Sequence, residues 1–180
     1  MDRVAIFIYG NNFYHGLKYV YKDKKLINFN FEKFANFLSR GRKLIKTFYY
    51  NAELDKSKDF DKYGSQERFF DEIKKIPKFS LILCKLLKRK IRGTDQYYYI
   101  LKEDDIHMAV DMVEGAFNDD FDIAIIVSGD GDFVPAVKAI QKKGKVMENI
   151  YFKKSSSRNL KQHGNDSLEL TKDILNEFFK

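Results

Sequence analysis

Apolar and polar residues follow one another in blocks along this chain, and the blocks predict strands that alternate with helices. Short apolar runs predict strands at residues 4–9, 44–52, 79–87, 122–127 and 145–152. Apolar residues at helical spacing predict helices around 13–20 and at 31–38, 59–76, 104–118 and 133–142. A basic turn at 88–95 and a tyrosine-rich return strand at 96–101 predict a hairpin, and 168–179 reads as an amphipathic C-terminal helix.

The pattern favours an α/β fold with a doubly wound, mainly parallel sheet and helices on both faces. The strands at 4–9 and 122–127 are continuously apolar, which is typical of strands buried on both faces. We expect one domain over 1–180, with its core at about 3–170. In the helix at 104–118 the side chains that we expect to be buried are Ile106, Ala109, Val110, Val113 and Phe117.

Composition narrows the class of partner. The 180 residues include 33 Lys and Arg against 26 Asp and Glu, a net charge of +7. This surplus favours a polyanionic partner, although a lysine-rich solvated surface would have the same composition. The single cysteine, Cys84, cannot form an intramolecular disulfide and reads as a core thiol. Without a signal peptide or a membrane-length apolar run we expect a cytoplasmic protein, with no membrane partner. The sequence is also compatible with a homodimer.

Two loops with unusual chemistry follow predicted strands. Gly10-Asn11-Asn12 follows the first strand, and Ser128 to Asp132 follows the strand at 122–127. In a doubly wound sheet, ligands bind outside the carboxyl ends of the strands. Asp130 and Asp132 therefore read as oxygen ligands for Mg²⁺ or Mn²⁺. The alternatives are structural, since Asp132 would cap the helix that follows and Gly10-Asn11-Asn12 would form a turn with a cap.

Further acidic residues lie in the helix at 104–118. Asp104 and Asp105 stand in its first turn, where a carboxylate is also favourable to the helix dipole. Asp111 lies among apolar neighbours on nearly the same face as Asp104. A partly buried carboxylate needs a partner, so Asp111 is either a site residue or half of a structural pair.

Basic residues cluster twice. The first group combines cations with flat rings, which suits single-stranded nucleic acid, although an exposed hairpin with inward tyrosines would have the same sequence. It contains Lys85, Lys88, Arg89, Lys90 and Arg92, followed by Tyr97, Tyr98 and Tyr99. The second group is 153–158, in which Ser156 and Arg158 are candidates to bind phosphate.

These segments together resemble the NYN domains of the LabA/DUF88 group, which are relatives of PIN nucleases. The resemblance rests on three runs in register. They are Gly10-Asn11-Asn12-Phe13-Tyr14-His15-Gly16, Lys102-Glu103-Asp104-Asp105 with Asp111, and Ser128-Gly129-Asp130-Gly131-Asp132-Phe133-Val134-Pro135. A pair of serines near the last helix of that family matches Ser156-Ser157. The resemblance covers about residues 3–170.

The resemblance implies a PIN-like fold and metal-dependent hydrolysis of RNA, most readily of single strands. By position, it implies that Asp105, Asp130 and Asp132 hold Mg²⁺ or Mn²⁺, that Asp104 or Asp111 can compensate for a missing acid, and that Asn12 orients a ligand. It further implies that Asn11, Ser128 and Lys102 contact the nucleic acid.

One departure from the family pattern is serious, because Tyr9 stands where that family has its first acidic ligand. Three hypotheses follow: a metal-dependent endoribonuclease, an RNA-binding domain with weak or no cleavage, and a protein-interaction module.

Overall fold

The computed structural model describes residues 1–54, 57, 59–84, 86–95, 97–101 and 103–179, without the side chains of 86–88 and 98–101. Its strands are β1 (Arg3–Tyr9), β2 (Lys43–Ala52), β3 (Phe79–Cys84), β4 (Leu86–Lys90), β5 (Tyr97–Leu101), β6 (Ile123–Val127), β7 (Val146–Tyr151) and β8 (Asp166–Glu169). Its α-helices are α1 (Gly10–Val20), α2 (Phe31–Ser39), α3 (Phe60–Lys75), α4 (Asp104–Phe117), α5 (Val134–Lys142), α6 (Arg158–His163) and α7 (Lys172–Asn176). Three 3₁₀ turns are η1 (Leu26–Asn28), η2 (Gly131–Phe133) and η3 (Lys153–Ser155).

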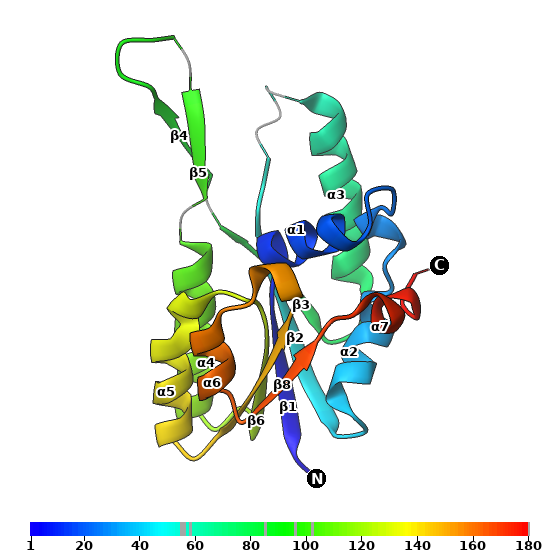
Figure 1. Ribbon diagram of the computed structural model, residues 1–180, viewed down its shortest axis with the longest axis vertical. Coiled ribbons are helices and arrows are strands. Elements are labelled where there is room, and N and C mark those ends of the chain that lie inside the picture. The colour runs from blue at the N-terminus through cyan, green and yellow to red at the C-terminus, as the bar shows by residue number, and fades with distance from the viewer. Residues whose placement is uncertain (55–56, 58, 85, 96, 102, 180) are drawn as a thin grey trace.

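Six strands form one sheet in the order β3-β2-β1-β6-β7-β8, and every pairing in it is parallel. Helices lie on both faces (Figure 1). This confirms the predicted fold class. The two central strands, β1 and β6, are the continuously apolar runs, and all five residues of β6 are buried. Their composition therefore follows from their position, since helices cover both sides of them.

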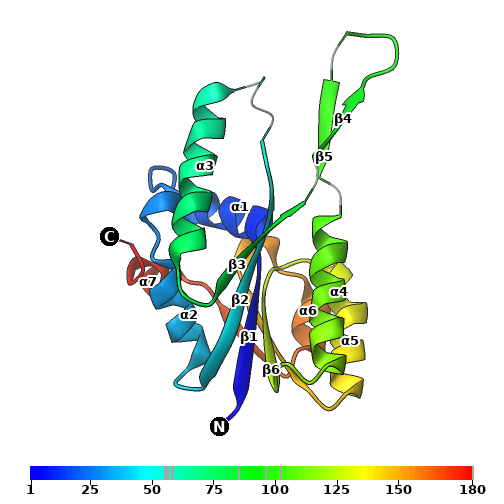
Figure 2. The ribbon, with the colours of Figure 1, turned by 180° about the vertical axis from the view of Figure 1, so that it is seen from behind.

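Each face of the sheet carries its own apolar core. On one face α1, α2, α3 and α7 cover a core rich in phenylalanine, in which the Phe13 ring contacts those of both Phe31 and Phe34. On the other face α4, α5 and α6 cover a second core that includes Met108 and Met112. Figure 2 shows the two helical layers from behind, with the sheet between them.

Helix α4 buries a different face from the one that its sequence predicts. Ile106, Val110 and Phe117 are 62%, 54% and 57% exposed, so the prediction that they are buried is wrong, while Ala109 and Val113 are partly buried. The inward side chains are Asp104, Met108, Met112, Gly115 and Ala116. Helix α4 is apolar on two opposite faces, and the face with methionines and small residues lets it approach the sheet and α5 closely.

Two predicted elements have different bounds in the structure. The strand expected at 79–87 ends its pairing with β2 at Cys84, and Leu86–Lys90 pairs instead with β5 in a separate hairpin. This hairpin rises away from the sheet above α4 (Figures 1 and 2). The helix expected at 168–179 is only α7, because Asp166–Glu169 pairs with β7 as an edge strand. Within the described residues, no helix has both the length and the apolarity to cross a membrane.

Candidate functional site

The chain reverses its direction of winding between β1 and β6. From β1 it builds β2 and β3 on one side, and it later returns to place β6, β7 and β8 on the other side. The carboxyl ends of β1, β6 and β7 therefore lie next to one another. In open α/β sheets this switch point is where ligands bind. The loop at 128–132 begins there, and so does α1, which includes Gly10-Asn11-Asn12 as its first turn, so the prediction of a loop at 10–12 is wrong.

Tyr9 ends β1 at this point and is partly buried, with its ring edge-to-face against Phe133 at 5.9 Å between centroids. Burial raises the pKa of the Tyr9 phenol well above its usual range, and the negative charges of Asp104, Asp105 and Asp130 raise it further. Three carboxylates from two distant parts of the chain thus act on one neutral phenol.

Asp104 is the most buried of these acids, with 2% of the residue exposed. Burial raises its pKa, and the interaction with the Tyr9 hydroxyl group opposes that rise. Its Oδ2 atom is buried and has no hydrogen-bond partner among the described residues. Asp105 is partly buried, and its Oδ1 accepts a hydrogen bond from the Ile106 backbone N–H at 2.9 Å.

The loop after β6 is held in a tight turn by its own side chains. The Ser128 Oγ atom accepts a hydrogen bond from the Asp130 N–H at 3.1 Å, and Asp130 Oδ1 accepts one from the Asp132 N–H at 3.0 Å. Asp130, and not Asp132, is therefore the residue that caps η2. Asp132 is exposed. Asn149 on β7 donates to the Ser128 carbonyl at 2.8 Å, which fixes the start of the loop.

Asn12 joins the three strand ends. Its Oδ1 accepts hydrogen bonds from the Gly129 N–H at 3.2 Å and from the Ser155 hydroxyl at 3.3 Å. Ser155 also explains why residue 129 is glycine, because a Cβ there would lie 1.8 Å from the Ser155 carbonyl oxygen. The segment after β7 therefore packs directly on the loop after β6, and Asn12 connects both to α1.

Asp111 has a different partner. Its Oδ2 accepts a hydrogen bond from the Tyr50 hydroxyl at 2.8 Å, and Tyr50 lies on β2 beside Tyr9. This bond ties the middle of α4 to the sheet. Among the described residues, no three His, Cys, Asp or Glu side chains are grouped so that they could hold a metal ion. The charges of Asp104, Asp105 and Asp130 all act on Tyr9, but these acids do not form such a group, and Asp111 is held at Tyr50.

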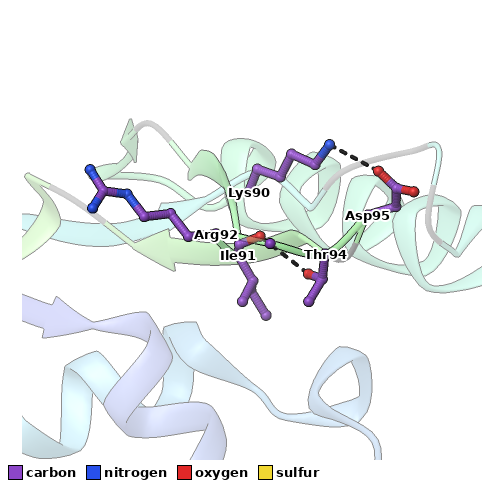
Figure 3. Close-up of a pocket in the computed structure, with 6 residues that line it drawn as sticks. Lys90, Ile91, Arg92, Thr94 and Asp95 are labelled. Atoms are coloured by element: carbon purple, nitrogen blue, oxygen red, sulfur yellow. Dashed lines mark hydrogen bonds and ion pairs between the residues drawn. The ribbon is translucent and has the colours of Figure 1, made fainter.

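The basic hairpin lies beyond α4. Arg89, Lys90 and Arg92 are exposed, and Lys90 forms an ion pair with Asp95 at 2.9 Å. Figure 3 shows Lys90, Arg92 and Asp95 among the residues that line a surface pocket at the turn. Lys85, Lys102 and the side chain of Lys88 lie outside the described residues.

The serine segment after β7 uses its hydroxyl groups locally. Ser156 donates a hydrogen bond to the Lys153 carbonyl at 2.9 Å, and Ser157 caps α6 by accepting from the Leu160 N–H at 3.2 Å. Arg158 is exposed, and Asn11 is partly buried beside Asn12.

The family model of the NYN domain matches residues 3–171, which is nearly the full chain. The chain belongs to the NYN domain family. Proteins of this family are generally nuclease-like. The sequence matches no curated protein.

Among solved structures, this NYN domain is similar to a protein of unknown function from Vibrio parahaemolyticus. The TM-score is 0.74 at 21% identity, over 97% of this chain and 96% of that one, so the likeness concerns the fold. Two weaker likenesses carry no argument. They are LpCGTa in complex with UDP (TM-score 0.30, 10% identity, 87% of this chain and 32% of that one) and the Plasmodium falciparum nicotinic acid mononucleotide adenylyltransferase (TM-score 0.36, 8% identity, 98% and 79%).

Two features of the NYN site are missed when the sequence is read by motif alone. The buried acid is Asp104, whereas the family register points to Asp105. The pattern that finds it is helical: Asp104, Met108 and Met112 recur every four residues and share the buried face of α4. The second feature is the contact of Ser155 with Asn12, which joins residues 143 positions apart and leaves no local signal.

Proposed function

We propose that this NYN domain is a metal-dependent endoribonuclease that hydrolyses phosphodiester bonds of RNA, with Mg²⁺ or Mn²⁺ as its cofactor. The observation that supports this proposal most strongly is the buried Asp104 Oδ2 atom, which has no hydrogen-bond partner among the described residues and lies at the switch point, where the charges of Asp105 and Asp130 also act on Tyr9. A cation bound there would give this oxygen a partner and would offset the repulsion among the three acids. The motifs further favour the LabA/DUF88 group within the family.

The acids at the switch point are of the type that binds a hard divalent cation, but no three of the described ones are grouped to hold it, so metal binding would have to draw them together. Carboxylate oxygens are the ligands that Mg²⁺ and Mn²⁺ prefer, and a buried oxygen without a partner, such as Asp104 Oδ2, is costly unless a ligand satisfies it. We assign metal binding to Asp105, Asp130 and Asp132, together with the buried Asp104. Asp111 is a further candidate ligand. When bound, the metal would activate water for attack on the phosphate and stabilise the charge that develops there.

The remaining residues would position the substrate. Asn12 and Ser128 hold the loop that carries Asp130, and Asn11 lies beside them. The net charge of +7 favours a polyanion, and the exposed Arg89 and Arg92 would meet the phosphates of a single strand. We assign the same role to Lys88, Lys90, Lys102, Ser156 and Arg158.

A cleavage assay on labelled single-stranded RNA tests the proposal. Wild type should cleave with Mn²⁺ or Mg²⁺ and stop with EDTA, and Asp130→Asn should lose activity by a hundredfold or more, on the order of a lost charge-stabilising group. Asp2→Asn is the matched control, because Asp2 is exposed and precedes the amino end of β1, whereas the site lies at the carboxyl end of that strand. Equal activity in Asp130→Asn and wild type would reject the assigned site.

A second candidate function is RNA binding with little or no cleavage, and Tyr9 favours it. A neutral phenol takes the place of an acid beside Asp104. Tyr9→Asp restores a carboxylate, and Tyr9→Phe removes only the hydroxyl group. A large gain in cleavage by Tyr9→Asp, with none by Tyr9→Phe, would show that this position limits the native site. Failure to bind any RNA at low salt would remove both functions and favour a protein-interaction module.

A further inference from the structure

An exposed aromatic ring and a lysine lie next to the candidate site, in a part of the chain to which the nuclease proposal assigns no role. Tyr19, near the end of α1, is 62% exposed. The Lys154 ammonium group lies over its ring, 4.3 Å from the centroid. The pair is flanked by further exposed cations, Lys22 and Lys153.

The position of this pair is fixed by the packing of α1 against the segment after β7. Asn12 accepts a hydrogen bond from Ser155 at one end of the contact. In the middle, Gly16 lies against the Phe152 ring so closely that a Cβ would come within 2.2 Å of it. Tyr19 meets Lys154 at the other end. Residues 12, 16 and 19 share one face of the helix, so a single interface sets both Asn12 and Tyr19.

This interface also sets the distance from the pair to the candidate site. Tyr19 lies seven positions after Asn12 in the α-helix, which is about 10 Å along the helix axis. A strand of RNA whose phosphate lies at Asn12 would therefore have a base at Tyr19 within a few nucleotides. Aromatic rings bind unpaired bases by stacking, and a cation beside the ring binds the neighbouring phosphate.

We propose that Tyr19 and Lys154 form a subsite for single-stranded RNA, in which an unpaired base stacks on Tyr19 and Lys154 binds the adjacent phosphate. The proposal rests on RNA being the substrate of the domain. Duplex RNA would not use the subsite, because its bases are stacked within the helix and are not free to meet a side chain.

The chain holds its own matched control. Phe117 is 57% exposed, and Lys143 lies over its ring at 4.3 Å from the centroid, the same distance as in the Tyr19 pair. Phe117 ends α4, and the first residue of that helix is at the candidate site. The Phe117 pair therefore lies at the other end of the helix, near the amino ends of the strands (Figure 1). Its neighbours in sequence are the acids Asp119 and Asp120. The two pairs therefore match in ring exposure and in cation-to-ring distance, but only the Tyr19 pair is placed to meet RNA.

Fluorescence anisotropy with a labelled oligouridine, in EDTA so that no cleavage occurs, measures the subsite directly. Tyr19→Ala should raise Kd about fivefold or more, and Tyr19→Phe should bind like wild type. An oligouridine with abasic residues should lose the difference between wild type and Tyr19→Ala. Lys154→Ala should reduce the slope of log Kd against log salt by about 0.7. Phe117→Ala and Lys143→Ala should leave Kd unchanged.

The inference is overturned if Tyr19→Ala binds oligouridine as wild type does, or if Phe117→Ala weakens binding equally. Its failure is separate from that of the nuclease proposal. Normal affinity in Tyr19→Ala together with lost cleavage in Asp130→Asn would remove the subsite and keep the nuclease. Weakened affinity in Tyr19→Ala, with no cleavage by wild type under any metal, would keep the subsite and remove the nuclease.

Discussion

Gly129→Ala is the sharpest test of how the candidate site is assembled. The added Cβ would lie 1.8 Å from the Ser155 carbonyl oxygen and 2.4 Å from its carbonyl carbon. Both contacts are to backbone, so a side-chain rotation cannot relieve them. Either the loop after β6 or the segment after β7 must move by more than an ångström. That movement would also break the hydrogen bond from the Gly129 N–H to Asn12.

The expected cost follows from these two effects. Overpacking at a close contact costs about 1–3 kcal/mol, and the lost hydrogen bond about 1 kcal/mol. We therefore expect Gly129→Ala to lower the free energy of unfolding by about 2–4 kcal/mol. Urea denaturation followed by circular dichroism, with the slope of the transition unchanged, measures this value.

Gly64→Ala is the matched control, because the same substitution there should raise the free energy of unfolding instead of lowering it. Gly64 lies inside α3, and nothing lies within 4 Å of where its Cβ would be. Alanine should stabilise the helix there by about 0.5–1 kcal/mol. An unfolding midpoint for Gly129→Ala equal to that of wild type would refute the described packing of residues 129 and 155.

Three further predictions concern the surroundings of the site and the sheet. Tyr50→Phe should lower stability by about 1–2 kcal/mol, measured by thermal denaturation, because Asp111 loses its donor. Arg42→Met should cost about 3 kcal/mol or more in the same assay, since Glu148 would remain buried without its ion-pair partner, and a neutral change would contradict this. Burial, together with nearby acids, raises the pKa of the Cys84 thiol to about 11, so native protein should react with iodoacetamide far more slowly at pH 8 than unfolded protein does. Equal labelling rates in the native and unfolded protein would refute the raised pKa. By linkage, ionisation of this thiol should lower the free energy of unfolding as pH rises from about 8.5, where the unfolded thiol ionises, to about 11.

The sequence pattern predicts the sheet well because burial and periodicity agree there. The runs that became β1 and β6 are apolar at every central position, which leaves few alternatives to a buried strand. The pattern fails at α4, where apolar residues occupy two opposite faces. Periodicity cannot choose between such faces, and close packing against the sheet selected the face with Met108 and Met112. The edge strand β8 is missed because its four residues, DSLE, include one apolar side chain and show no apolar run.

Part of the candidate site is likewise predicted by the sequence, and part of it is not. The topology of an α/β sheet predicts that the segments after β1 and β6 meet, and they do, through the hydrogen bond from the Gly129 N–H to Asn12 in the first turn of α1. Which acid of Asp104 and Asp105 turns inward depends on the rotation of α4, which its own sequence leaves ambiguous. The partner of Asp111, Tyr50, is 61 residues away and has no local signature.

A crystal grown with Mn²⁺ tests the central claim most directly, by anomalous diffraction at the end of β1 and β6. We expect one anomalous peak within oxygen-ligand distance of Asp130 and of at least one of Asp104 and Asp105. A structure at saturating Mn²⁺ with no peak there, and with the α4 acids more than about 10 Å from Asp130, would contradict the metal site and with it the nuclease.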